Sequence, residues 1–543
     1  MAHPALAHPQ RLRELSYQAL AGRTLRRTAR RVLASVTEPR IAVLARCDDV
    51  LATWLAGFPG VRVVGLEPGL TRWERQGRLA GAGPLDLLVD DGENGDGVID
   101  RFVESFRHLR KGGTYVLTAR SPHAGERLHQ FLHDLRAGHE VPVAAADRQS
   151  LARAVREIGR DRGQLTVTRR GRTLAKLREN EMNEALAVDA SRGRILATVP
   201  AAEFDSRCEM RASGRARKDR TKERYEAPTL YLREYFDVSC RLKSVVIQRG
   251  LLCPDTYRHH LNTNLTHKSL KDAGRQYVVA PRNQPPARRL EGTYFHLDNE
   301  IRGFFGHALT EQVSRLWGWQ QARERYPDVK ALLSINRGRE VAEWELTLLE
   351  AGGIDRSDVE VIREPVRVER LLSATPMFSM PAYVHPRIIE TWDAVGAALR
   401  GQASDRAYPS RIFCSRQDDR RPCVNRDEVE SLFVAHGFQV VFPEELPLPD
   451  QVAMFHQADV IAGYAGSALF TTLFSDRRKH LVVITPDTYG PSNEYMISAV
   501  RGHRLDVVVG ISESTVGKES LRAPFVVDPA TDGRWLTEVL DGL

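Results

Sequence analysis

A short apolar run near the C-terminal end of the chain is followed by a loop rich in arginine. The run is Ile412–Cys414, and the loop contains Arg416, Arg420 and Arg421. A guanidinium group can bond two phosphate oxygens at once, so arginines gathered after a strand are suited to a phosphate or diphosphate. We predict that Arg416 and Arg421 bind an anionic ligand. The alternative is an ordinary basic surface loop.

A glycine-rich turn follows a second apolar run, Asp459–Ala462. It reads Gly-x-x-Gly-Ser-Ala and stands before a helical pattern. Gly466 lets the backbone approach a ligand without a Cβ, and the amides at a helix start attract negative charge. Because an open α/β sheet holds its ligand at the carboxyl ends of its strands, we expect this turn to bind the same anion as the arginines. The residues predicted to contact the anion are Gly463, Gly466, Ser467 and Ala468.

A second segment with side chains that could take part in catalysis contains His307, Glu311 and Arg315, spaced four residues apart. On an α-helix this spacing puts the side chains on one face. A carboxylate or an imidazole can take a proton from an attacking hydroxyl that lies within hydrogen-bond reach. We predict Glu311 as the first candidate for a general base and His307 as the second, or both acting as a pair. The alternative is an i, i+4 pair that only stabilises a helix end.

The ordered pattern between 411 and 474 resembles glycosyltransferase family 61. That family includes plant xylosyltransferases, animal N-acetylglucosaminyltransferases and bacterial capsular-polysaccharide proteins. Its pattern has an Arg after a strand, then Arg-x-x-x-Asn-x-x-Glu, Gly-Phe, Pro-Glu, Gln and Gly-x-x-Gly. The matching residues are Arg416, Arg421, Asn425, Glu428, Gly437, Phe438, Pro443, Glu444, Gln451, Gly463 and Gly466. The stretch 306–311 is similar to the family's Gly-His-x-Leu-x-Glu.

The resemblance implies an inverting transfer of a sugar from a nucleotide-sugar to a hydroxyl acceptor, on a GT-B type pair of Rossmann-like subdomains. Arg416 and Arg421 would stabilise the departing nucleoside diphosphate, so no metal and no other cofactor is expected. UDP is the expected nucleotide, because the family mostly uses UDP-sugars. The first subdomain would hold the acceptor and the base, and the second would hold the donor.

Three more residues are candidates for donor binding on the strength of the resemblance: Asn425, Asn493 and Glu494. Each has a structural alternative. Asn425 with Glu428 has the spacing of a capping box at a helix start. The segment Tyr489–Tyr495 has the composition of a turn followed by a helix cap.

The sequence also departs from the family pattern at three positions. Ala465 stands where many members have His, Thr471 where Asn is common, and Arg426 where Glu is common. The missing His cannot take part in the reaction, which gives more weight to Glu311 and His307 as the base.

The N-terminal part alternates apolar runs with helical patterns, which is typical of an α/β domain. Asp90-Asp91-Gly92 after one run and Leu-x-x-Gly-Gly at 109–113 resemble a class I S-adenosylmethionine-dependent methyltransferase. Glu67 falls where that fold keeps its ribose-binding acid. However, Ala45–Asp49 lacks the glycines that let the backbone close on the cofactor. We predict a cofactor-free domain used for packing or interaction, with an active methyltransferase as the alternative. The predicted strands are Ile41–Leu44, Val61–Gly65, Leu85–Asp90 and Thr114–Leu117.

The length of 543 residues is too great for one core, so several domains are expected. We predict an α/β fold throughout. The predicted limits are 1–205 for the methyltransferase-like domain, 206–227 for a basic linker, 228–400 for the acceptor-side subdomain and 401–543 for the nucleotide-sugar subdomain. The segments 239–249 and 275–279 are expected to be strands of the acceptor side.

Composition and charge limit the expected partners and cellular location of the protein. The net charge is +8, and the densest basic run, 211–224, has no aromatic residues that would stack on bases, so we expect no nucleic-acid partner. The chain lacks a long apolar run and an N-terminal secretion signal, and its six cysteines form no CxxC pair. We expect a cytoplasmic, bacterial protein that associates peripherally with polysaccharide machinery on the inner face of the membrane. Its partners would be a nucleotide-sugar donor and a glycan or lipid-linked glycan acceptor, with a non-catalytic scaffold as the alternative function.

Overall fold

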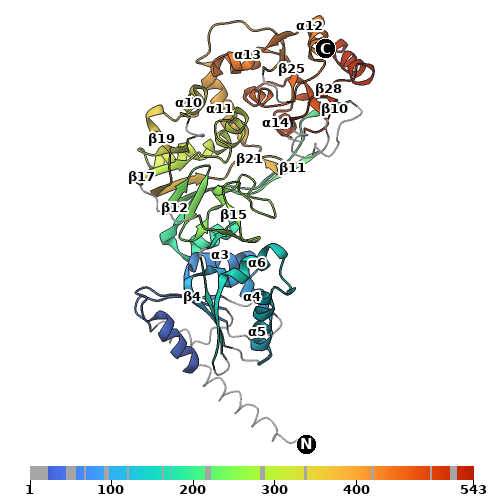
Figure 1. The fold of residues 1–543 in the computed structure, drawn as a ribbon. Coiled ribbons are helices and arrows are strands. Elements are labelled where there is room, and N and C mark those ends of the chain that lie inside the picture. Colours follow the sequence, from blue (N-terminus) through green and yellow to red (C-terminus); the bar gives the residue numbers. More distant parts are fainter. Residues whose placement is uncertain are drawn as a thin grey trace, which may run out of the picture. The chain divides into compact units, whose positions relative to one another are not determined.

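The computed structural model describes most of the chain. The described ranges are 23–44, 55, 57–66, 69–90, 97–118, 122–161, 164–171, 173–213, 222–281, 288–335, 339–417, 421–489, 492–513 and 522–543. The chain forms two compact units, each made of three segments (Figure 1). Unit 1 comprises Met1–Ile195, Glu234–Glu291 and Glu364–Leu371, and unit 2 comprises Leu196–Arg233, Gly292–Arg363 and Leu372–Leu543. The units interleave along the sequence, so the predicted domain limits stay predictions.

Unit 1 begins with a mostly parallel sheet in the order β2-β1-β3-β4-β6-β5. Its strands are β1 (Arg40–Leu44), β2 (Arg62–Leu66), β3 (Leu85–Asp90), β4 (Leu109–Thr118), β5 (Val155–Asp161) and β6 (Gln164–Arg169). Alternate residues of β1 pack into two different apolar clusters, so both faces of this strand are covered. A parallel strand covered on both faces is apolar along its whole length, which is why the predicted N-terminal strands are confirmed.

Helices surround this sheet. They are α3 (Arg72–Ala82), α4 (Val98–Ser105), α5 (Pro122–Ala137), α6 (Ala145–Ala154) and α7 (Glu179–Val188). α3 starts at a capping box, in which Thr71 and Glu74 satisfy each other's backbone amides. Two glycines let α3 approach α7 closely. A Cβ on Gly77 would lie 2.6 Å from the Glu181 carbonyl oxygen, and one on Gly81 would lie 2.8 Å from that of Ala185.

The remainder of unit 1 is built from shorter strands. They include β7 (Thr173–Lys176), β13 (Val245–Gln248), β14 (Leu251–Leu252), β15 (Lys271–Asp272) and β16 (Tyr277–Val279), while β12 (Leu230–Arg241) pairs with β13 and continues into unit 2. The single strand predicted over 239–249 is wrong. The chain reverses between β12 and β13, where Lys243 and Ser244 both have a left-handed backbone with φ of 64° and 67°. Two such residues in a row form a tight hairpin turn.

The middle of unit 2 is a βαβαβ arrangement. Its elements are β17 (Arg288–His296), α8 (Phe305–His307), a π-helical turn η6 (Ala308–Gln312), a 3₁₀ segment η7 (Val313–Gly318), α9 (Trp319–Arg325), β18 (Lys330–Ser334), α10 (Glu343–Ala351) and β19 (Val359–Ile362). β18 pairs in parallel with both β17 and β19. The helical segment that contains His307 and Glu311 therefore follows the carboxyl end of β17, although 297–304 stand between them.

The C-terminal part of unit 2 contains a parallel sheet in the order β10-β27-β26-β25-β23-β24. Its strands are β10 (Glu209–Ala212), β23 (Arg411–Cys414), β24 (Gln439–Val441), β25 (Val460–Tyr464), β26 (His480–Pro486) and β27 (Arg504–Ser512), with β28 (Phe525–Val526) antiparallel to β27. The helices are α12 (Arg426–Ala435), α13 (Leu448–Gln457), a 3₁₀ helix η10 (Leu469–Phe474), α14 (Asn493–Arg501) and α15 (Arg534–Asp541). From β24 to β27 the order is that of a doubly wound fold, in which the winding reverses between β23 and β25.

The two parts of unit 2 share one hydrophobic core. Leu309 and Trp392 belong to the same buried cluster as Phe470 and Ile497. Trp392 lies on α11 (Ile388–Arg400) and is completely buried. This shared core fixes the segment around His307 relative to η10 and α14. The α/β fold class is confirmed, whereas the GT-B arrangement stays a prediction.

Part of the predicted basic linker is a strand rather than a solvated segment. β10 pairs in parallel with β27, and Arg211 makes a two-pronged ion pair with the buried Asp506 at 2.7 and 2.9 Å. Cys208, Met210 and Ala212 alternate along this segment and pack on the core of the sheet. The high density of basic residues hid this period-two pattern in the sequence.

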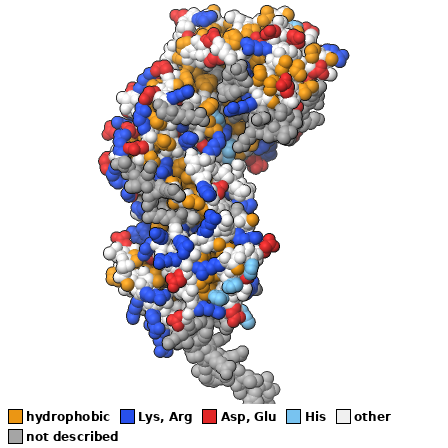
Figure 2. All heavy atoms as spheres, viewed as in Figure 1, with side chains coloured by type: hydrophobic (Ala, Val, Ile, Leu, Met, Phe, Trp, Pro, Cys, Tyr) orange, Lys and Arg blue, Asp and Glu red, His pale blue; other side chains and the backbone are white. Residues whose placement is uncertain are grey.

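Charged side chains are mixed on the visible face, with Lys and Arg scattered among Asp and Glu (Figure 2). On this face the two signs of charge are therefore interspersed. Within the described ranges, no helix has the length and hydropathy needed to cross a membrane.

Candidate active site in unit 2

Two predicted anion-binding arginines come together at the switch point of the C-terminal sheet. Arg416 follows β23, and its Nη2 donates to the carbonyl oxygen of Ala465, which follows β25, at 2.9 Å. Arg421 reaches the same oxygen with its own Nη2 at 3.4 Å. A Cβ built on Gly466 would lie 3.6 and 3.7 Å from these two nitrogen atoms. The guanidinium groups therefore lie side by side over the Ala465–Gly466 peptide, at the carboxyl ends of two adjacent parallel strands.

Each arginine also lies over a tyrosine ring. The guanidinium carbon of Arg416 is 5.4 Å from the centre of the Tyr464 ring, and that of Arg421 is 4.1 Å from the centre of the Tyr489 ring. Rings in these positions limit the rotation of long side chains and add cation–π attraction. The Nε of Arg421 is buried without a hydrogen-bond partner in the described part of the chain. Arg421 also has a left-handed φ of 56°, a strained conformation that is often retained at functional sites.

A buried carboxyl group holds the turn after β25. Oε1 of Glu494, at the start of α14, accepts a hydrogen bond of 2.9 Å from the Gly466 amide. Burial raises the pKa of Glu494 to about 7, against the lowering effects of this hydrogen bond and of Arg421 and Arg416. The Gly466 amide is therefore occupied and cannot also bind a ligand. The amides of Ser467 and Ala468 have no partner among the described residues.

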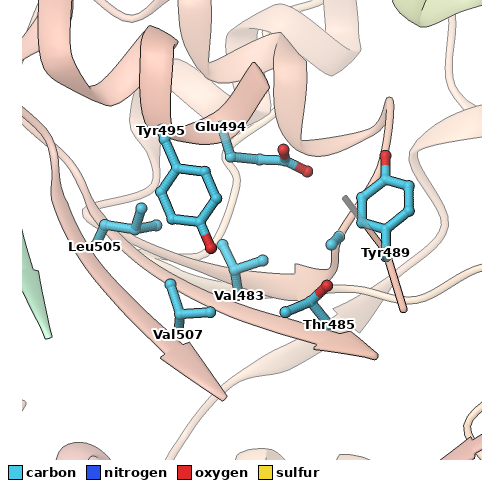
Figure 3. A pocket seen from close by; sticks show the side chains of 8 residues that line it. Val483, Thr485, Tyr489, Glu494, Tyr495, Leu505 and Val507 are labelled. Carbon is cyan, nitrogen blue, oxygen red and sulfur yellow. The ribbon is translucent and has the colours of Figure 1, made fainter. Parts of the chain in front are cut away.

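Glu494 also lines a small pocket above the sheet (Figure 3). In Figure 3 its carboxyl group points toward Tyr489, while Val483 and Thr485 rise from the strand below. The lining residues are Ala465, Val483, Thr485, Tyr489, Glu494, Tyr495, Leu505 and Val507. The pocket shares Tyr489 and Glu494 with the arginine site, so both are parts of one region.

The raised pKa of Glu494 gives a pH-dependent contribution to stability. In the unfolded chain this carboxyl ionises near its ordinary value of 4.5, whereas in the folded protein it ionises near 7. The stability it contributes is therefore complete below pH 4.5 and is lost as the pH rises through 7, a loss of about 3 kcal/mol. Glu494→Gln keeps an oxygen for the Gly466 amide and removes this loss. We expect the apparent Tm of Glu494→Gln to match that of the wild type at pH 5 and to exceed it by roughly 5 °C at pH 8.

The exposed Glu428 provides the control for this experiment, because Glu428→Gln should change the Tm little at either pH. Differential scanning calorimetry over the pH range tests the expectation. A difference between Glu494→Gln and wild type that does not vary with pH would contradict a raised pKa at Glu494.

The glycine-rich turn differs from its predicted form. Gly463 is inside β25 and not in the loop, and a Cβ there would lie 2.6 Å from the Cys414 carbonyl oxygen of the neighbouring strand. This glycine is thus required by the packing of β23 against β25. The helix that follows is a short 3₁₀ segment, so any bound anion would depend on the arginines and two free amides more than on a helix dipole.

Asn425 and Asn493, two further residues predicted to bind the donor, have structural environments of their own. The Asn425 carboxamide bonds the backbone of Val527, donating to its carbonyl at 2.9 Å and accepting from its amide at 3.1 Å. The predicted capping box is wrong, because the Asn425 side chain makes no capping hydrogen bond at the start of α12. Its Nδ2 lies 3.3 Å from Oε2 of Glu428 instead. Asn493 is buried at the first position of α14.

His307 and Glu311 form a direct pair. Nδ1 of His307 lies 2.7 Å from Oε1 of Glu311, and the two side chains are 25% and 15% exposed. The ring of Phe304 meets the His307 ring edge to face at 6.2 Å. With Glu311 ionised, its oxygen can only accept, so Nδ1 of His307 carries the proton and Nε2 keeps a free lone pair. A base held by a carboxylate in this way is a recurrent catalytic arrangement.

Arg315 does not extend this pair, contrary to the predicted alignment on one helical face. Its guanidinium is buried and donates to the Ala374 carbonyl at 2.6 Å. The reason is the irregular helix, which changes from α through a π turn to 3₁₀ between Phe305 and Gly318. The angular spacing of an α-helix therefore fails after Glu311, and π turns are frequent at functional sites.

Gly306 brings the His307–Glu311 pair next to the arginine site. A Cβ on Gly306 would lie 2.9 Å from the Cβ of Ser467 and 2.9 Å from the Phe470 ring, distances that only glycine tolerates. Ser467 is exposed and follows Gly466, which faces both arginines. The His307–Glu311 pair and the arginine site are thus close together in one unit, on segments more than a hundred residues apart in the sequence.

The tyrosines were not predicted as site residues. Tyr464 is the last residue of β25 and Tyr489 follows β26, so both stand at strand ends, where ligands bind in this fold. Their position at strand ends is the feature of the sequence that could have identified them as site residues. In the described ranges, no group of three or more His, Cys, Asp or Glu residues is arranged to hold a metal ion.

The methyltransferase-like features of unit 1 are described only in part. Ala45–Asp49, Glu67, Asp91 and Gly92 lie outside the described residues. Asp90 is fully buried and accepts hydrogen bonds from Arg101 at 2.9 Å and Tyr115 at 2.6 Å. It therefore has structural partners at the end of β3.

The comparison with family models agrees with the first of the two resemblances. Residues 305–483 match the family model described as Glycosyltransferase 61. Part of the chain is similar to crystal structures of MycE, a methyltransferase from the mycinamycin biosynthetic pathway, in complex with Mg and SAH. The identity is 19% and the TM-score 0.22, with 26% of this chain and 48% of that chain covered. A second MycE structure, which also contains mycinamycin VI, has the same identity and TM-score and covers 28% of this chain.

This chain spans about half the length of the MycE chains that it matches. None of the curated proteins in the comparison matches it. The family match is located where the geometry places the candidate site, since it includes His307, Glu311, Arg416 and Gly466. Residues 305–483 are therefore a glycosyltransferase 61 domain, and membership of that family implies glycosyl transfer.

Proposed function

We propose that the protein is an inverting, metal-independent glycosyltransferase of the GT-B type. It would transfer a sugar from a UDP-linked donor to a hydroxyl of a glycan or lipid-linked glycan during surface polysaccharide synthesis. The observation that carries this proposal is the convergence of Arg416 and Arg421 on the Ala465–Gly466 peptide at the switch point of a parallel sheet. Doubly wound sheets bind phosphorylated ligands at this point.

In the proposed reaction, the acceptor hydroxyl attacks the anomeric carbon and loses its proton to the His307–Glu311 pair. The bond from the anomeric carbon to the diphosphate oxygen breaks on the opposite side, and the electron pair leaves with the UDP. The two guanidinium groups and the free amides of Ser467 and Ala468 stabilise this new negative charge. Because a hydroxyl replaces the diphosphate from the opposite face, the configuration at the anomeric carbon inverts.

The proposal includes a cytoplasmic location, peripheral to the inner face of the membrane. Within the described residues, cysteines occur only as free thiols, which suits a reducing compartment. They are Cys208, Cys240, Cys253, Cys414 and Cys423. Unit 1 would recruit or position a component of the polysaccharide machinery, with no S-adenosylmethionine bound.

Calorimetric titration with UDP in the presence of EDTA tests the donor site. We expect the wild type to bind UDP with micromolar affinity. Arg416→Ala removes a charge-assisted contact worth roughly 1.5–3 kcal/mol, so its affinity should be lower by roughly tenfold to more than a hundredfold. Arg356 is an exposed arginine of the same unit, paired with Glu343 and Glu350, and Arg356→Ala should bind UDP like the wild type.

The absence of any binding to UDP, GDP or CMP would refute the donor site and favour a non-catalytic scaffold. Binding that needs a divalent metal, and is therefore lost in EDTA, would contradict the metal-independent mechanism but not the site. If Arg416→Ala and the wild type bound UDP with equal affinity, the nucleotide would have to bind elsewhere than at the switch point.

A further inference from the structure

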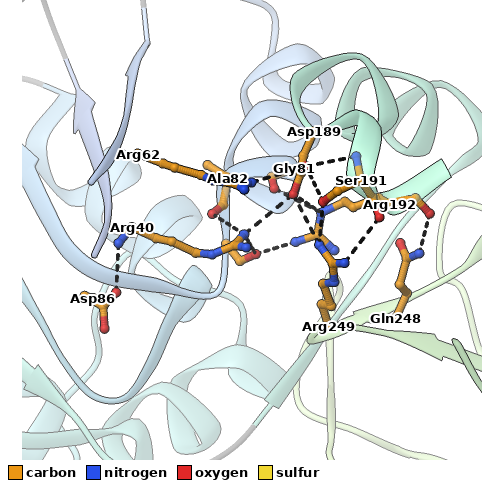
Figure 4. Close-up of polar contacts among 11 residues, drawn as sticks. Arg40, Arg62, Gly81, Ala82, Asp86, Asp189, Ser191, Arg192, Gln248 and Arg249 are labelled. Atoms are coloured by element: carbon orange, nitrogen blue, oxygen red, sulfur yellow. Dashed lines mark hydrogen bonds and ion pairs between the residues drawn. The ribbon is translucent and has the colours of Figure 1, made fainter. Parts of the chain in front are cut away.

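A cluster of arginines surrounds one carboxylate in unit 1 (Figure 4). Asp189 lies 3.7 Å from Arg40, 3.4 Å from Arg62, 3.8 Å from Arg192 and 3.4 Å from Arg249. Figure 4 shows the side chains of Arg40, Arg192 and Arg249 directed toward Asp189 from different elements. We call these five residues the Asp189 cluster.

The fold of unit 1 brings the cluster together from distant parts of the sequence. Arg40 and Arg62 are the first residues of the parallel strands β1 and β2, and Asp189 ends α7. Arg249 lies in the turn between β13 and β14, with a left-handed φ of 42°. The cluster thus stands at the amino ends of β1 and β2. A cofactor of an open α/β sheet would bind at the opposite, carboxyl ends, so this is a separate location.

The cluster contains more positive than negative charge. One carboxylate faces four guanidinium groups, and the closest approach is 3.4 Å, longer than the 2.7–2.9 Å of a strong charge-assisted hydrogen bond. The Asp189 oxygen Oδ1 is also bonded by the amide and hydroxyl of Ser191. Asp86, which accepts from the Arg40 amide, is paired with Arg110 and does not neutralise the cluster.

Backbone carbonyl groups compensate part of this charge. Arg192 donates to the carbonyl of Gly81 at 3.0 Å and to that of Gly83, at the C-terminal end of α3. Arg40 donates to the carbonyls of Ala82 and Gly83 at 3.4 and 3.3 Å. No such carbonyl group is bonded by Arg62, whose side chain makes no hydrogen bond or ion pair with a described residue other than Asp189.

Arg192 is the innermost member and is completely buried. Its Nη1 has no hydrogen-bond partner in the described part of the chain. Burial, together with the positive charge of Arg249, lowers the pKa of Arg192 to about 10. A charge with little contact with water acts strongly on its surroundings, because the local dielectric constant is low. Arg192 therefore adds positive potential behind the outer arginines.

The outer arginines are accessible. The side chain of Arg62 is 56% exposed, that of Arg249 is 30% exposed and that of Arg40 is 19% exposed. Guanidinium groups in such an arrangement can offer several parallel N–H donors to the oxygens of a tetrahedral anion. An ion with two negative charges would bring the cluster from an excess of three positive charges to one.

We propose that the Asp189 cluster binds a phosphate group through Arg62, Arg249 and Arg40. The phosphate would belong to a free inorganic phosphate or pyrophosphate, or to a phospholipid headgroup. Arg192 and Asp189 position the outer arginines and do not contact the ligand. The site is in unit 1, and it does not depend on the proposed glycosyl transfer in unit 2.

Calorimetric titration with inorganic phosphate and with pyrophosphate tests the site, with chloride used to match the ionic strength. All variants carry Arg416→Ala, so that phosphate binding in unit 2 does not interfere. We expect saturable binding in this background and at least tenfold weaker binding after adding Arg62→Gln or Arg249→Gln. Arg156→Gln, at an exposed arginine of the same unit, is the matched control and should bind like the background protein.

Arg62→Lys keeps the charge but not the planar fork, so it checks the result if a Gln variant is unstable. Partial binding by Arg62→Lys is expected. Flotation with vesicles containing phosphatidic acid then distinguishes a phospholipid headgroup from a free phosphate as the ligand. If the site binds a headgroup, the protein should float with the vesicles and Arg62→Gln should abolish this. If the site binds free phosphate, the protein should not float with them. No saturable heat in the background protein, or equal affinity in the Arg62 and Arg249 variants, would overturn the proposal and leave the cluster with a purely structural role.

Discussion

Glu311→Gln is expected to lower kcat for glycosyl transfer roughly 10²- to 10⁴-fold, the usual contribution of general base catalysis. Gln has almost the same shape as Glu and can still accept the hydrogen bond from His307 Nδ1, which lies 2.7 Å away in the wild type. The substitution therefore removes the negative charge with little change of geometry. Without that charge, the pair can no longer stabilise the proton that the acceptor hydroxyl gives up.

The measurement is steady-state transfer from a UDP-sugar, together with a UDP titration of the same variant. Because the proposed role of Glu311 is to take the proton of the acceptor hydroxyl, UDP affinity should stay within a factor of two or so of the wild type. Glu324, an exposed residue of α9 that contacts Gln320, provides the control Glu324→Gln. Wild-type kcat in Glu311→Gln would exclude Glu311 from the reaction.

His307→Gln separates the two candidates for the base. If Nε2 of His307 takes the proton and Glu311 only holds the ring, His307→Gln should remove the acidic limb of the pH–rate profile and lose at least as much activity as Glu311→Gln. If Glu311 itself is the base, His307→Gln should lose less activity and keep that limb. Either result is compatible with the pair as the proton acceptor, whereas wild-type kcat in both variants is not.

The sequence patterns led to residues that the structure brings together in the candidate site, and their roles stay predictions. Arg416, Arg421 and Gly466 were found because they follow apolar runs, and parallel strands buried on both faces make such runs easy to identify. His307 and Glu311 were found by their spacing of four residues. In both cases the deciding pattern is local, within one strand–loop or one helical turn.

The parts that were missed depend on contacts between distant segments. The hydrogen bond from the Gly466 amide to Glu494 joins the turn after β25 to the start of α14, and it removes one amide that the sequence assigned to the ligand. Asn425 has the spacing of a helix cap, but its carboxamide is satisfied by Val527, about a hundred residues away. Neither contact has a signal within its own segment. Gly463 was assigned to the wrong role for the same reason, since the need for glycine comes from the neighbouring strand.

The irregular helix after Phe305 shows a second limit of sequence patterns. Periodicity assumes a regular α-helix, and a single π turn is enough to rotate Arg315 into the core while His307 and Glu311 remain paired. The linker prediction failed around Arg211 because a high density of charge was taken as the sign of a solvated segment. Arg211 is indeed exposed, but it lies on a strand, pairs with the buried Asp506 of the neighbouring strand and alternates with residues that pack on the sheet.

Arg421→Ala is expected to lower kcat roughly 10²- to 10³-fold, because the charge on the leaving diphosphate develops in the transition state and is stabilised there. Arg421 has no ion pair with a described residue, whereas Arg426 nearby is paired with Glu430. Its Nε has no hydrogen-bond partner among the described residues, and its guanidinium carbon lies 4.1 Å from the centre of the Tyr489 ring. These features leave its remaining donors available for a ligand. KM for the donor should change less than kcat.

Arg421→Lys and Tyr489→Leu show which property of Arg421 is needed. Lys keeps the charge but loses the planar fork and the stacking, so its activity should lie between those of wild type and Arg421→Ala. Tyr489→Leu removes the ring that limits the rotation of Arg421, which should lower kcat less than Arg421→Ala does. Arg421 and Arg416 bond the same carbonyl oxygen, so their separate losses should not add in the double variant. Full additivity would contradict the coupling of the two arginines through this shared oxygen. A rise in KM with unchanged kcat would mean that the arginines bind the donor in its ground state without acting on the departing diphosphate.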